Sequence, residues 1–278
     1  MTVVNSNISA VVAQRAMAMN QRDLTTAMTE LSTGKRINSS ADDAAGLAIG
    51  NKMATRISSL NMAVRNANEG ISLLQTADGA ASTLSDMLFR MRELAIQSGN
   101  DTNSSPGRSA LQSEISALQS QITNILSNTE WNDMKALKGE AGTAGTVSFQ
   151  VGASSADYFT LNMTSLDTGS LADAQTLASV NISTRSGATN ALNTIDGALT
   201  QIDQARTQWG ATANRLVHAA DNATNVSLNT SASRSRIMDA DYAQTTADLA
   251  RAMILDQAGA AMLTQANQKP MYVLALLR

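Results

Sequence analysis

Residues 31–49 read LSTGKRINSSADDAAGLAI, and from Ile49 a stripe of apolar residues continues to Leu94. Its members lie three or four residues apart, which places them on one side of a helix. They are Met53, Ile57, Leu60, Val64, Ala67, Ile71, Leu74, Ala77, Ala81, Leu84, Leu88, Met91 and Leu94. The stretch from Leu31 to Gln97 contains no proline, so we expect a helical rod of roughly 70–80 Å. A rod of this length is more typical of an assembly than of a globular core.

The stretch also carries signals for where the helix begins and ends. Ser40, followed three residues later by Asp43, predicts a capping-box-like start, and Asp42 adds negative charge to the first turn. Gly99-Asn100 predicts an end with a left-handed cap. The interior glycines lower the helical propensity by up to about 1 kcal/mol each, so the rod needs a packing partner, which their small size would let approach closely. These glycines are Gly46, Gly50, Gly70 and Gly79.

The composition of the 278 residues favours packed helices and excludes several classes of site. Aromatic residues make up only 3 % of the chain, although 43 % of it is hydrophobic. The net charge of −3 argues against a nucleic-acid partner, which would require a basic surface. The absence of cysteine excludes disulfides and thiolate metal sites. No apolar run is long enough to span a membrane, and the N-terminus does not resemble a cleaved secretory signal. We therefore expect no membrane insertion.

The remaining segments predict further helices around a small β-hairpin. Residues 1–30 carry a weaker apolar stripe, and Ser105-Pro106 opens a helix antiparallel to the rod. Residues 146–151 and 158–163 alternate apolar and polar side chains, which indicates a hairpin. The polar stretch 164–187 has Leu171 and Leu177 as expected anchors. A third rod follows at 192–226, and a last helix ends in an apolar tail.

The apolar stripes of the two chain ends have no evident partner inside the molecule. We expect them to find partners in neighbouring copies, so that the ends fold on assembly. The predicted assembly residues are Val4, Ile8, Val11, Met19, Leu31, Leu249, Met253, Leu263, Val273, Leu274, Leu276 and Leu277. The expected fold class is therefore mainly α, with long antiparallel helical rods or a coiled-coil bundle built from both chain ends and a small β-hairpin region in the middle.

Long blocks at both ends resemble the bacterial flagellin family. They are LSTGKRINSSADDAAGLAI (31–49), SLNMAVRNANEGISLLQTADGA (59–80), MRELAIQSGNDTNS (91–104), FQVGA (149–153) and the final 48 residues from Ser231. The interval between the helical ends is short, so this chain resembles a flagellin without large outer domains. The resemblance implies a structural, non-enzymatic subunit, without cofactors, that self-assembles into the extracellular flagellar filament for swimming motility.

The resemblance also implies a domain division and a set of partners. Residues 1–40 and 241–278 would form an inner coiled-coil domain, residues 41–135 and 190–240 a helical rod domain, and residues 136–189 a short outer segment. Export would proceed without a cleaved signal peptide. The expected partners are further copies of the chain, an export chaperone at the C-terminal segment, and the filament cap and hook–filament junction proteins. By the same resemblance, Arg90, Leu94 and Glu114 match positions through which vertebrate Toll-like receptors recognise flagellins.

Other functions fit the sequence less well. The carboxylates Asp42-Asp43, Asp239 and Asp241 could hold a metal, but helix caps explain them better. His218 is the sole histidine, so it cannot complete a catalytic or zinc constellation, and a flagellin with a metalloprotease insert is excluded. A chemoreceptor-like coiled coil would normally have its hairpin tip near the chain centre, which here is rich in glycine. A hook–filament junction protein would share the terminal pattern but less of the block at 31–49.

Overall fold

The computed structural model describes residues 6–142, 145–163, 166 and 177–276, and the side chains of these residues up to Gln268. The described helices are α1 (Ile8–Thr33), α2 (Ala44–Gly99), α3 (Ser105–Asn128), α4 (Arg185–Met238), α5 (Tyr242–Leu276) and a short 3-10 helix (Leu177–Ser179). The strands are β1 (Glu130–Trp131), β2 (Met134–Lys135), β3 (Thr146–Gln150) and β4 (Tyr158–Asn162). The fold is therefore mainly α with a small β-hairpin, as the sequence predicts.

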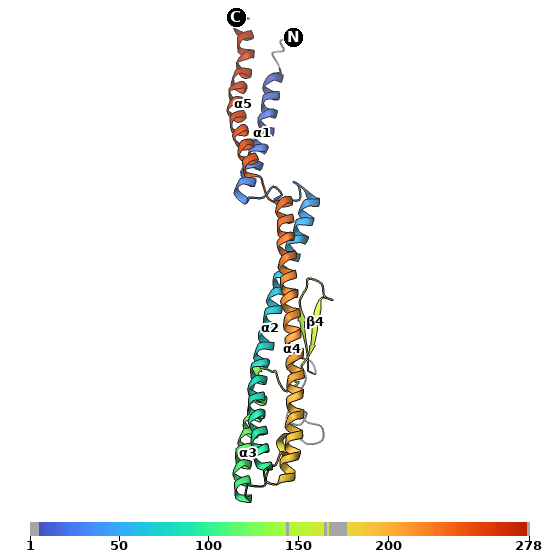
Figure 1. Ribbon diagram of the computed structural model, residues 1–278. Coiled ribbons are helices and arrows are strands. Elements are labelled where there is room, and N and C mark those ends of the chain that lie inside the picture. The colour runs from blue at the N-terminus through green and yellow to red at the C-terminus, as the bar shows by residue number, and fades with distance from the viewer. Residues whose placement is uncertain (1–5, 143–144, 164–165, 167–176, 277–278) are drawn as a thin grey trace. The chain divides into compact units, whose positions relative to one another are not determined.

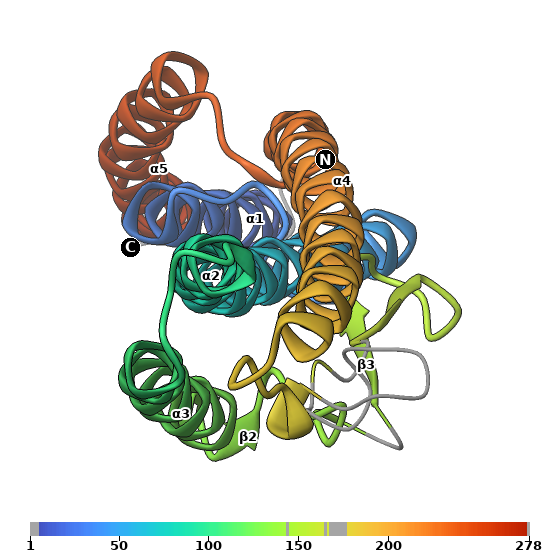
Figure 2. The same cartoon turned by 60° about the horizontal axis from the view of Figure 1, so that its bottom comes forward.

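The chain divides into two compact units. One takes its residues from Met1–Ile57 and Leu228–Arg278, and the other comprises Ser58–Ser227. In the first unit α1 and α5 lie side by side, and in the second α2 lies beside α4 (Figure 1). Figure 2 views the second unit from its lower end, with α3 near α2 and the segment that contains the strands beside α3 and α4.

The start of α2 differs in detail from the prediction. The cap is Asp43 rather than Ser40: its Oδ1 accepts a hydrogen bond from the backbone N–H of Gly46 at 2.8 Å. Asp42 instead closes the preceding turn, because its carboxylate accepts the N–H groups of Asn38 and Ser39. Residues 34–43 therefore separate α1 from α2, and α2 is roughly 84 Å long for its 56 residues.

The end of α2 lies where the sequence predicts it, but not by the predicted mechanism. The left-handed glycine is not Gly99 but Gly34, which ends α1 with a φ of 69° and donates its N–H to the carbonyl of Glu30. At the end of α2 the carbonyl of Gln97 accepts both the backbone N–H of Asn100 and the side-chain amide of Asn103. These two donors satisfy the carbonyl without a left-handed residue.

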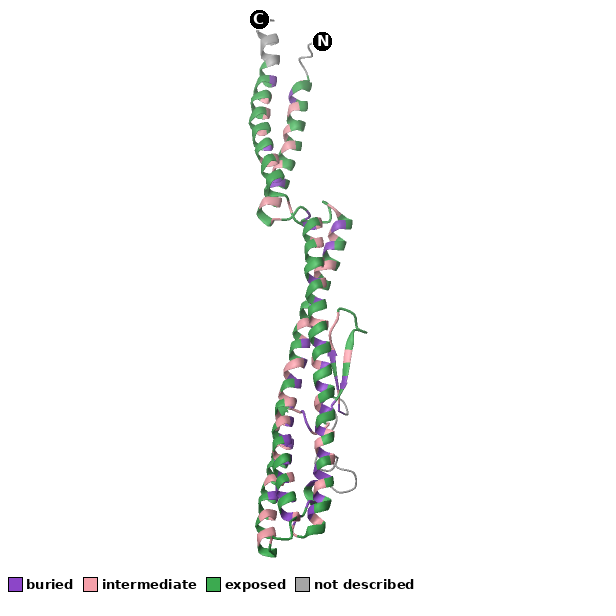
Figure 3. Ribbon diagram, in the orientation of Figure 1, coloured by how far each residue is buried: buried purple, intermediate pink, exposed green. Residues whose placement is uncertain are grey.

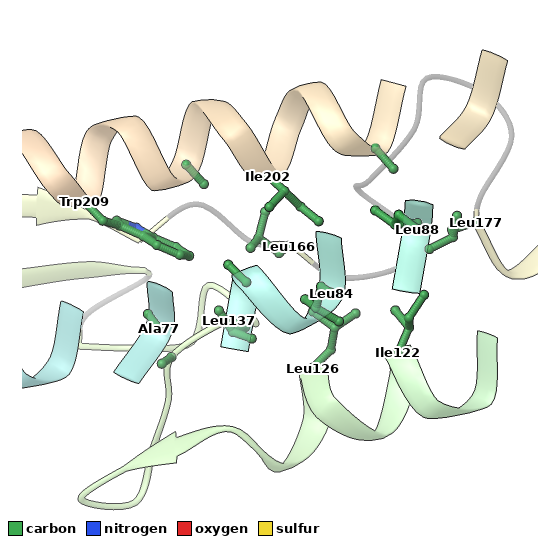
Figure 4. Packing of buried hydrophobic residues seen from close by; sticks show 14 of the residues in the cluster. Ala77, Leu84, Leu88, Ile122, Leu126, Leu137, Leu166, Leu177, Ile202 and Trp209 are labelled. Atoms are coloured by element: carbon green, nitrogen blue, oxygen red, sulfur yellow. The ribbon is translucent and has the colours of Figure 1, made fainter. Parts of the chain in front are cut away.

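The core of the second unit is built by α2, α3 and α4 together with the irregular segment between them. Figure 4 shows Ile202 and Trp209 of α4 facing Leu84 and Ala77 of α2, with side chains of α3 and the irregular segment completing the cluster. The apolar stripe of α2 supplies one wall, and Trp209 is only 1 % exposed. The predicted anchor Leu177 is buried here, whereas Leu171 lies outside the described residues.

The predicted hairpin is present and lies against α2. Strands β3 and β4 pair antiparallel, with Val147 opposite Leu161 and Phe149 opposite Phe159. Phe149 occupies the space left by the missing side chain of Gly70, where an added Cβ would lie 2.9 Å from the ring. Glycine at this position therefore permits the close approach that the sequence predicts for the rod, although between a helix and a hairpin.

Candidate assembly surface

Helices α1 and α5 contact each other along a heptad repeat that mixes small, polar and larger apolar residues. The buried and half-buried positions on each helix alternate in steps of three and four, which is the spacing of a coiled-coil seam. On α1 they are Ala10, Ala13, Met17, Asn20, Leu24, Ala27 and Leu31, and on α5 they are Thr245, Leu249, Ala252, Asp256, Gly259, Leu263 and Ala266. Several members of each set are alanine, glycine or polar, and the larger apolar members are only half-buried, so the pair buries limited apolar surface.

Two asparagines, Asn20 in the seam and Asn7 just before α1, fix how the two helices align. The side-chain amide of Asn20 donates to the carbonyl of Ala252 at 2.8 Å, and that of Asn7 donates to the carbonyl of Ala266 at 2.9 Å. A polar residue inside a coiled-coil seam specifies register at some cost in stability. The pair is therefore well defined in register but only weakly stabilised by its own packing.

The segments that enter and leave this helix pair are joined to each other. Residues 34–37 lie against residues 237–240, where the N–H of Arg36 donates to the carbonyl of Met238 at 2.8 Å and the N–H of Ala240 donates to the carbonyl of Gly34 at 3.0 Å. Ile37 beside them is 1 % exposed. This cross-connection, built from backbone hydrogen bonds, holds the C-terminal end of α1 and the N-terminal end of α5 together within the first unit.

Large apolar side chains lie on the outer faces of α1 and α5, away from the seam. In Figure 3 both helices are mostly coloured as exposed, whereas α2 and α4 carry rows of buried residues. The exposed fractions of the large apolar residues are between 51 % and 67 %: Ile8, Val11, Val12, Met19 and Met28 on α1, and Met253, Ile254, Leu255 and Met262 on α5. Large apolar side chains exposed together on two adjacent helices make this region a candidate interaction surface. We call these nine residues the outer apolar set.

The predicted assembly residues fall on two different surfaces. Leu31, Leu249 and Leu263 are half-buried in the seam between α1 and α5. Four others belong to the outer apolar set: Ile8, Val11, Met19 and Met253. Val4 and Leu277 lie outside the described residues, and Val273, Leu274 and Leu276 belong to α5, with side chains that are not described. The sequence pattern did not separate the two surfaces, because large apolar residues occur on both of them.

Three of the acidic residues considered as metal ligands accept hydrogen bonds that shape a turn and the starts of two helices. Backbone hydrogen bonds from Ser39 and Asn38 lower the pKa of Asp42, and Asp43 caps α2. The Asp241 side chain accepts the N–H of Ala243 at 2.9 Å in the first turn of α5. Within the described residues, no three histidine, cysteine or acidic side chains gather in a way that could hold a metal ion.

The three residues proposed for receptor recognition are only partly brought together on the surface. The Nε of Arg90 on α2 donates to Glu114 Oε1 on α3 at 2.9 Å, and both side chains are about half exposed. This contact with Glu114, followed by the one with Glu93, raises the pKa of Arg90. Leu94 is 1 % exposed and belongs to the core, so it supports α2 from within and does not lie on the surface.

Comparison with known proteins identifies a protein family for both ends of the chain. Residues 4–142 match the bacterial flagellin N-terminal helical region, and residues 192–277 match the bacterial flagellin C-terminal helical region. A flagellin of Halalkalibacterium halodurans is 42 % identical over 99 % of this chain and 100 % of its own length. Flagellin B of Vibrio cholerae is 33 % identical, with 99 % of both chains covered.

The relatives also support the short form of the protein. The alignment with Vibrio cholerae flagellin B extends over 374 positions, more than the 278 residues of this chain, so that relative contains residues without a counterpart here. The crystal structure of Bacillus cereus flagellin is similar with a TM-score of 0.50 and 29 % identity, over 57 % of this chain and 88 % of that one. Among the described residues, no helix is long and apolar enough to cross a membrane.

The helical architecture, the unpartnered apolar faces and the comparisons agree with one another. They favour a filament subunit over the hook–filament junction protein and the chemoreceptor-like coiled coil. The chain belongs to the bacterial flagellin family and is a structural, self-assembling subunit of the flagellar filament.

Proposed function

We propose that the outer apolar set of α1 and α5 is the surface through which each subunit packs against neighbouring subunits in the filament. The observation that carries this proposal is the exposure of nine large apolar side chains on two adjacent helices whose mutual contact leaves these residues uncovered. The second unit buries most of its large apolar residues in a core, although Phe89, Ile96 and Tyr158 are more than half exposed there. The outward position of the outer apolar set in the first unit therefore fits a partner outside the molecule.

Energetics support a surface that is completed by several neighbours. Burying one large apolar side chain contributes roughly 1.5–3 kcal/mol, whereas ordering each backbone residue costs about 1–2 kcal/mol. The small residues of the seam cannot offset this cost alone, so α1 and α5 gain most of their stability on assembly. A head-to-tail contact that does not close into a ring then produces a helical filament.

The domain division is part of the same proposal. Residues 1–40 and 241–278 form the inner layer, residues 41–135 and 190–240 form the surrounding rods, and residues 136–189 face outward. Supporting this division, the chain leaves the helical conformation near both proposed boundaries, at residues 34–43 and 239–241. The structural role of the family also supports the expectation that the chain has no catalytic activity.

We further propose the partners that a filament subunit requires. An export chaperone binds the C-terminal segment before export, which proceeds without a cleaved signal peptide, and the cap and junction proteins contact the ends of the filament. The exposed apolar residues Met253, Ile254 and Leu255 of α5 support the chaperone, because such a surface needs cover before assembly.

The innate-receptor hypothesis rests on Arg90 and Glu114. Their paired, half-exposed side chains are available to a receptor, while Leu94 acts indirectly by holding α2 in place. If the hypothesis holds, Arg90→Ala reduces signalling by the monomer in a receptor-reporter assay, and an unchanged signal contradicts it.

The assembly proposal is tested by placing a charge on the proposed surface. Val12 of α1 is 62 % exposed, and Tyr158 of the hairpin is 57 % exposed. We expect Val12→Glu to abolish filament formation, measured by sedimentation and electron microscopy, because a buried unpaired carboxylate is strongly unfavourable. The matched control Tyr158→Glu introduces the same charge on the outward segment and should still assemble. Normal filaments from Val12→Glu would contradict the proposal.

A further inference from the structure

The sulfur chemistry of this chain is confined to methionine. It has 14 methionines and no cysteine, and the described methionines differ widely in exposure. Met91, Met163 and Met238 are at most 4 % exposed, whereas Met19, Met28, Met253 and Met262 are between 51 % and 63 % exposed. Exposure of the thioether to solvent governs its oxidation, so the two groups should differ in reactivity.

The four most exposed of the described methionines all belong to the outer apolar set. Met253 directly precedes Ile254 and Leu255 on α5, and Met19 follows Val12 by seven residues, two turns along the same side of α1. By contrast, Met17 lies in the seam against Gly259. The most exposed of the described methionines are therefore on the surface that the proposed function places between subunits.

We propose that Met19, Met28, Met253 and Met262 form an oxidation site that controls assembly: peroxide oxidation of these residues in the free subunit prevents its incorporation, and incorporation protects them. This inference rests on the proposed function of the outer apolar set. It adds to that surface a modification (methionine oxidation), a class of oxidant (peroxide) and a consequence (loss of assembly).

The reaction is a transfer of one oxygen atom. A lone pair of the thioether sulfur attacks one oxygen of hydrogen peroxide, an S–O bond forms and the O–O bond breaks. The sulfur loses two electrons and the peroxide is reduced; the departing hydroxide takes the proton of the transferred oxygen and leaves as water. The product is methionine sulfoxide, and methionine sulfoxide reductases return it to the thioether.

The sulfoxide changes the property that assembly requires. Its oxygen is a polar hydrogen-bond acceptor, and burying such a group without a donor is costly. Each oxidised methionine should therefore weaken the contact between subunits, by about tenfold or more when the group is fully buried without a partner. The buried methionines of the second unit are shielded by their own core and are not affected.

The experiment treats purified subunits with hydrogen peroxide and maps oxidation at each methionine by peptide mass spectrometry. We expect preferential oxidation of the four residues, with Met91 and Met163 as internal controls, and a rise of at least about tenfold in the critical concentration for assembly. Reduction by methionine sulfoxide reductases should restore assembly. Subunits with all four residues replaced by leucine should keep assembling after treatment.

A matched variant controls for methionines elsewhere on the surface. Met62 on α2 is 44 % exposed but lies in the second unit, so Met62→Leu should remain as sensitive to peroxide as the natural chain. If the fourfold leucine variant does not assemble even without peroxide, the rescue of the natural chain by the reductases decides the question.

The outcomes separate this inference from the proposed function. Unimpaired assembly of subunits oxidised at the four methionines would overturn the inference and leave the proposed function intact, provided that these residues are protected in filaments. Oxidation at the same rate in filaments and in free subunits would overturn both, because the outer apolar set would then not be covered. Protection in filaments together with reversible loss of assembly supports both.

Discussion

Replacing Ile254 with alanine separates the contribution of the outer apolar set to assembly from its contribution to the subunit. Ile254 lies on α5 and is 67 % exposed. The change removes three carbons, each worth about 0.8 kcal/mol when fully buried. Two-thirds of this burial has yet to occur in the free subunit, so completing it between subunits contributes about 1.6 kcal/mol. The critical concentration for assembly should therefore rise roughly tenfold to twentyfold.

The same change should leave the free subunit almost unaffected. The burial already present is worth about 0.8 kcal/mol, and alanine recovers a few tenths of a kcal/mol through its higher helix propensity. In contrast, Leu88→Ala in the core, at 1 % exposure, should destabilise the subunit by about 2–5 kcal/mol. In the same measurements Leu88→Ala should therefore show the opposite pattern, with its main effect on the stability of the free subunit.

The assay combines urea unfolding of the free subunit, followed by circular dichroism, with the protein concentration left in the supernatant after filaments are sedimented. The reasoning is refuted if Ile254→Ala leaves the supernatant concentration unchanged. It is also refuted if this variant destabilises the free subunit as strongly as Leu88→Ala does.

Three further predictions concern other parts of the fold. Gly70→Ala should displace the hairpin, because the added Cβ would lie 2.9 Å from the Phe149 ring; tryptophan fluorescence and near-ultraviolet circular dichroism should report the change, and unaltered spectra would count against the close approach. Hydrogen bonds from Ser39 and Asn38 lower the pKa of Asp42 in the folded chain. The stability that the ionised Asp42 adds to the fold is therefore present above the ordinary pKa of 3.8, and it is lost as the pH falls through the lowered pKa. The Ser39 amide NMR shift should follow this titration in the natural chain and not in Asp42→Asn. Arg92→Ala breaks an exposed ion pair between α2 and α4 and should change the unfolding free energy by less than about 1 kcal/mol, so a larger loss would indicate a role that its exposure does not explain.

The rods and the hairpin could be predicted from the sequence because large residues mark their buried sides. On α2, Leu84, Leu88 and Met91 repeat at helical spacing and are all buried. In the hairpin, Val147 and Phe149 alternate with polar residues and both face inward. In these elements hydrophobic size and burial coincide, so periodicity alone identified the core.

The contact between α1 and α5 could be predicted only in part, through Leu31, Leu249 and Leu263. Its seam includes Ala10, Asn20 and Gly259, none of which stands out in a search for large apolar residues. The large residues nearby, such as Ile8 and Met253, are exposed instead. The sequence therefore identified the helices, but only the structure separated the face that joins α1 to α5 from the exposed face that we propose for other subunits.

The cap of α2 illustrates a smaller error of the same kind. Ser40 and Asp43 both suit a helix start, and the sequence favoured the serine. The choice depends on the turn at residues 38–42, where Asp42 accepts two backbone N–H groups and leaves Asp43 to cap the helix. Such competition between neighbouring side chains is decided by the local backbone and not by residue type.

The most direct test of the account compares backbone hydrogen exchange in the dilute subunit and in the filament. We predict that the amides of α1 and α5 exchange rapidly in the subunit and slowly in the filament, while those at the core of α2 and α4 are protected in both. Slow exchange of α1 and α5 in the dilute subunit, equal to that in the filament, would contradict the claim that neighbouring copies stabilise these helices.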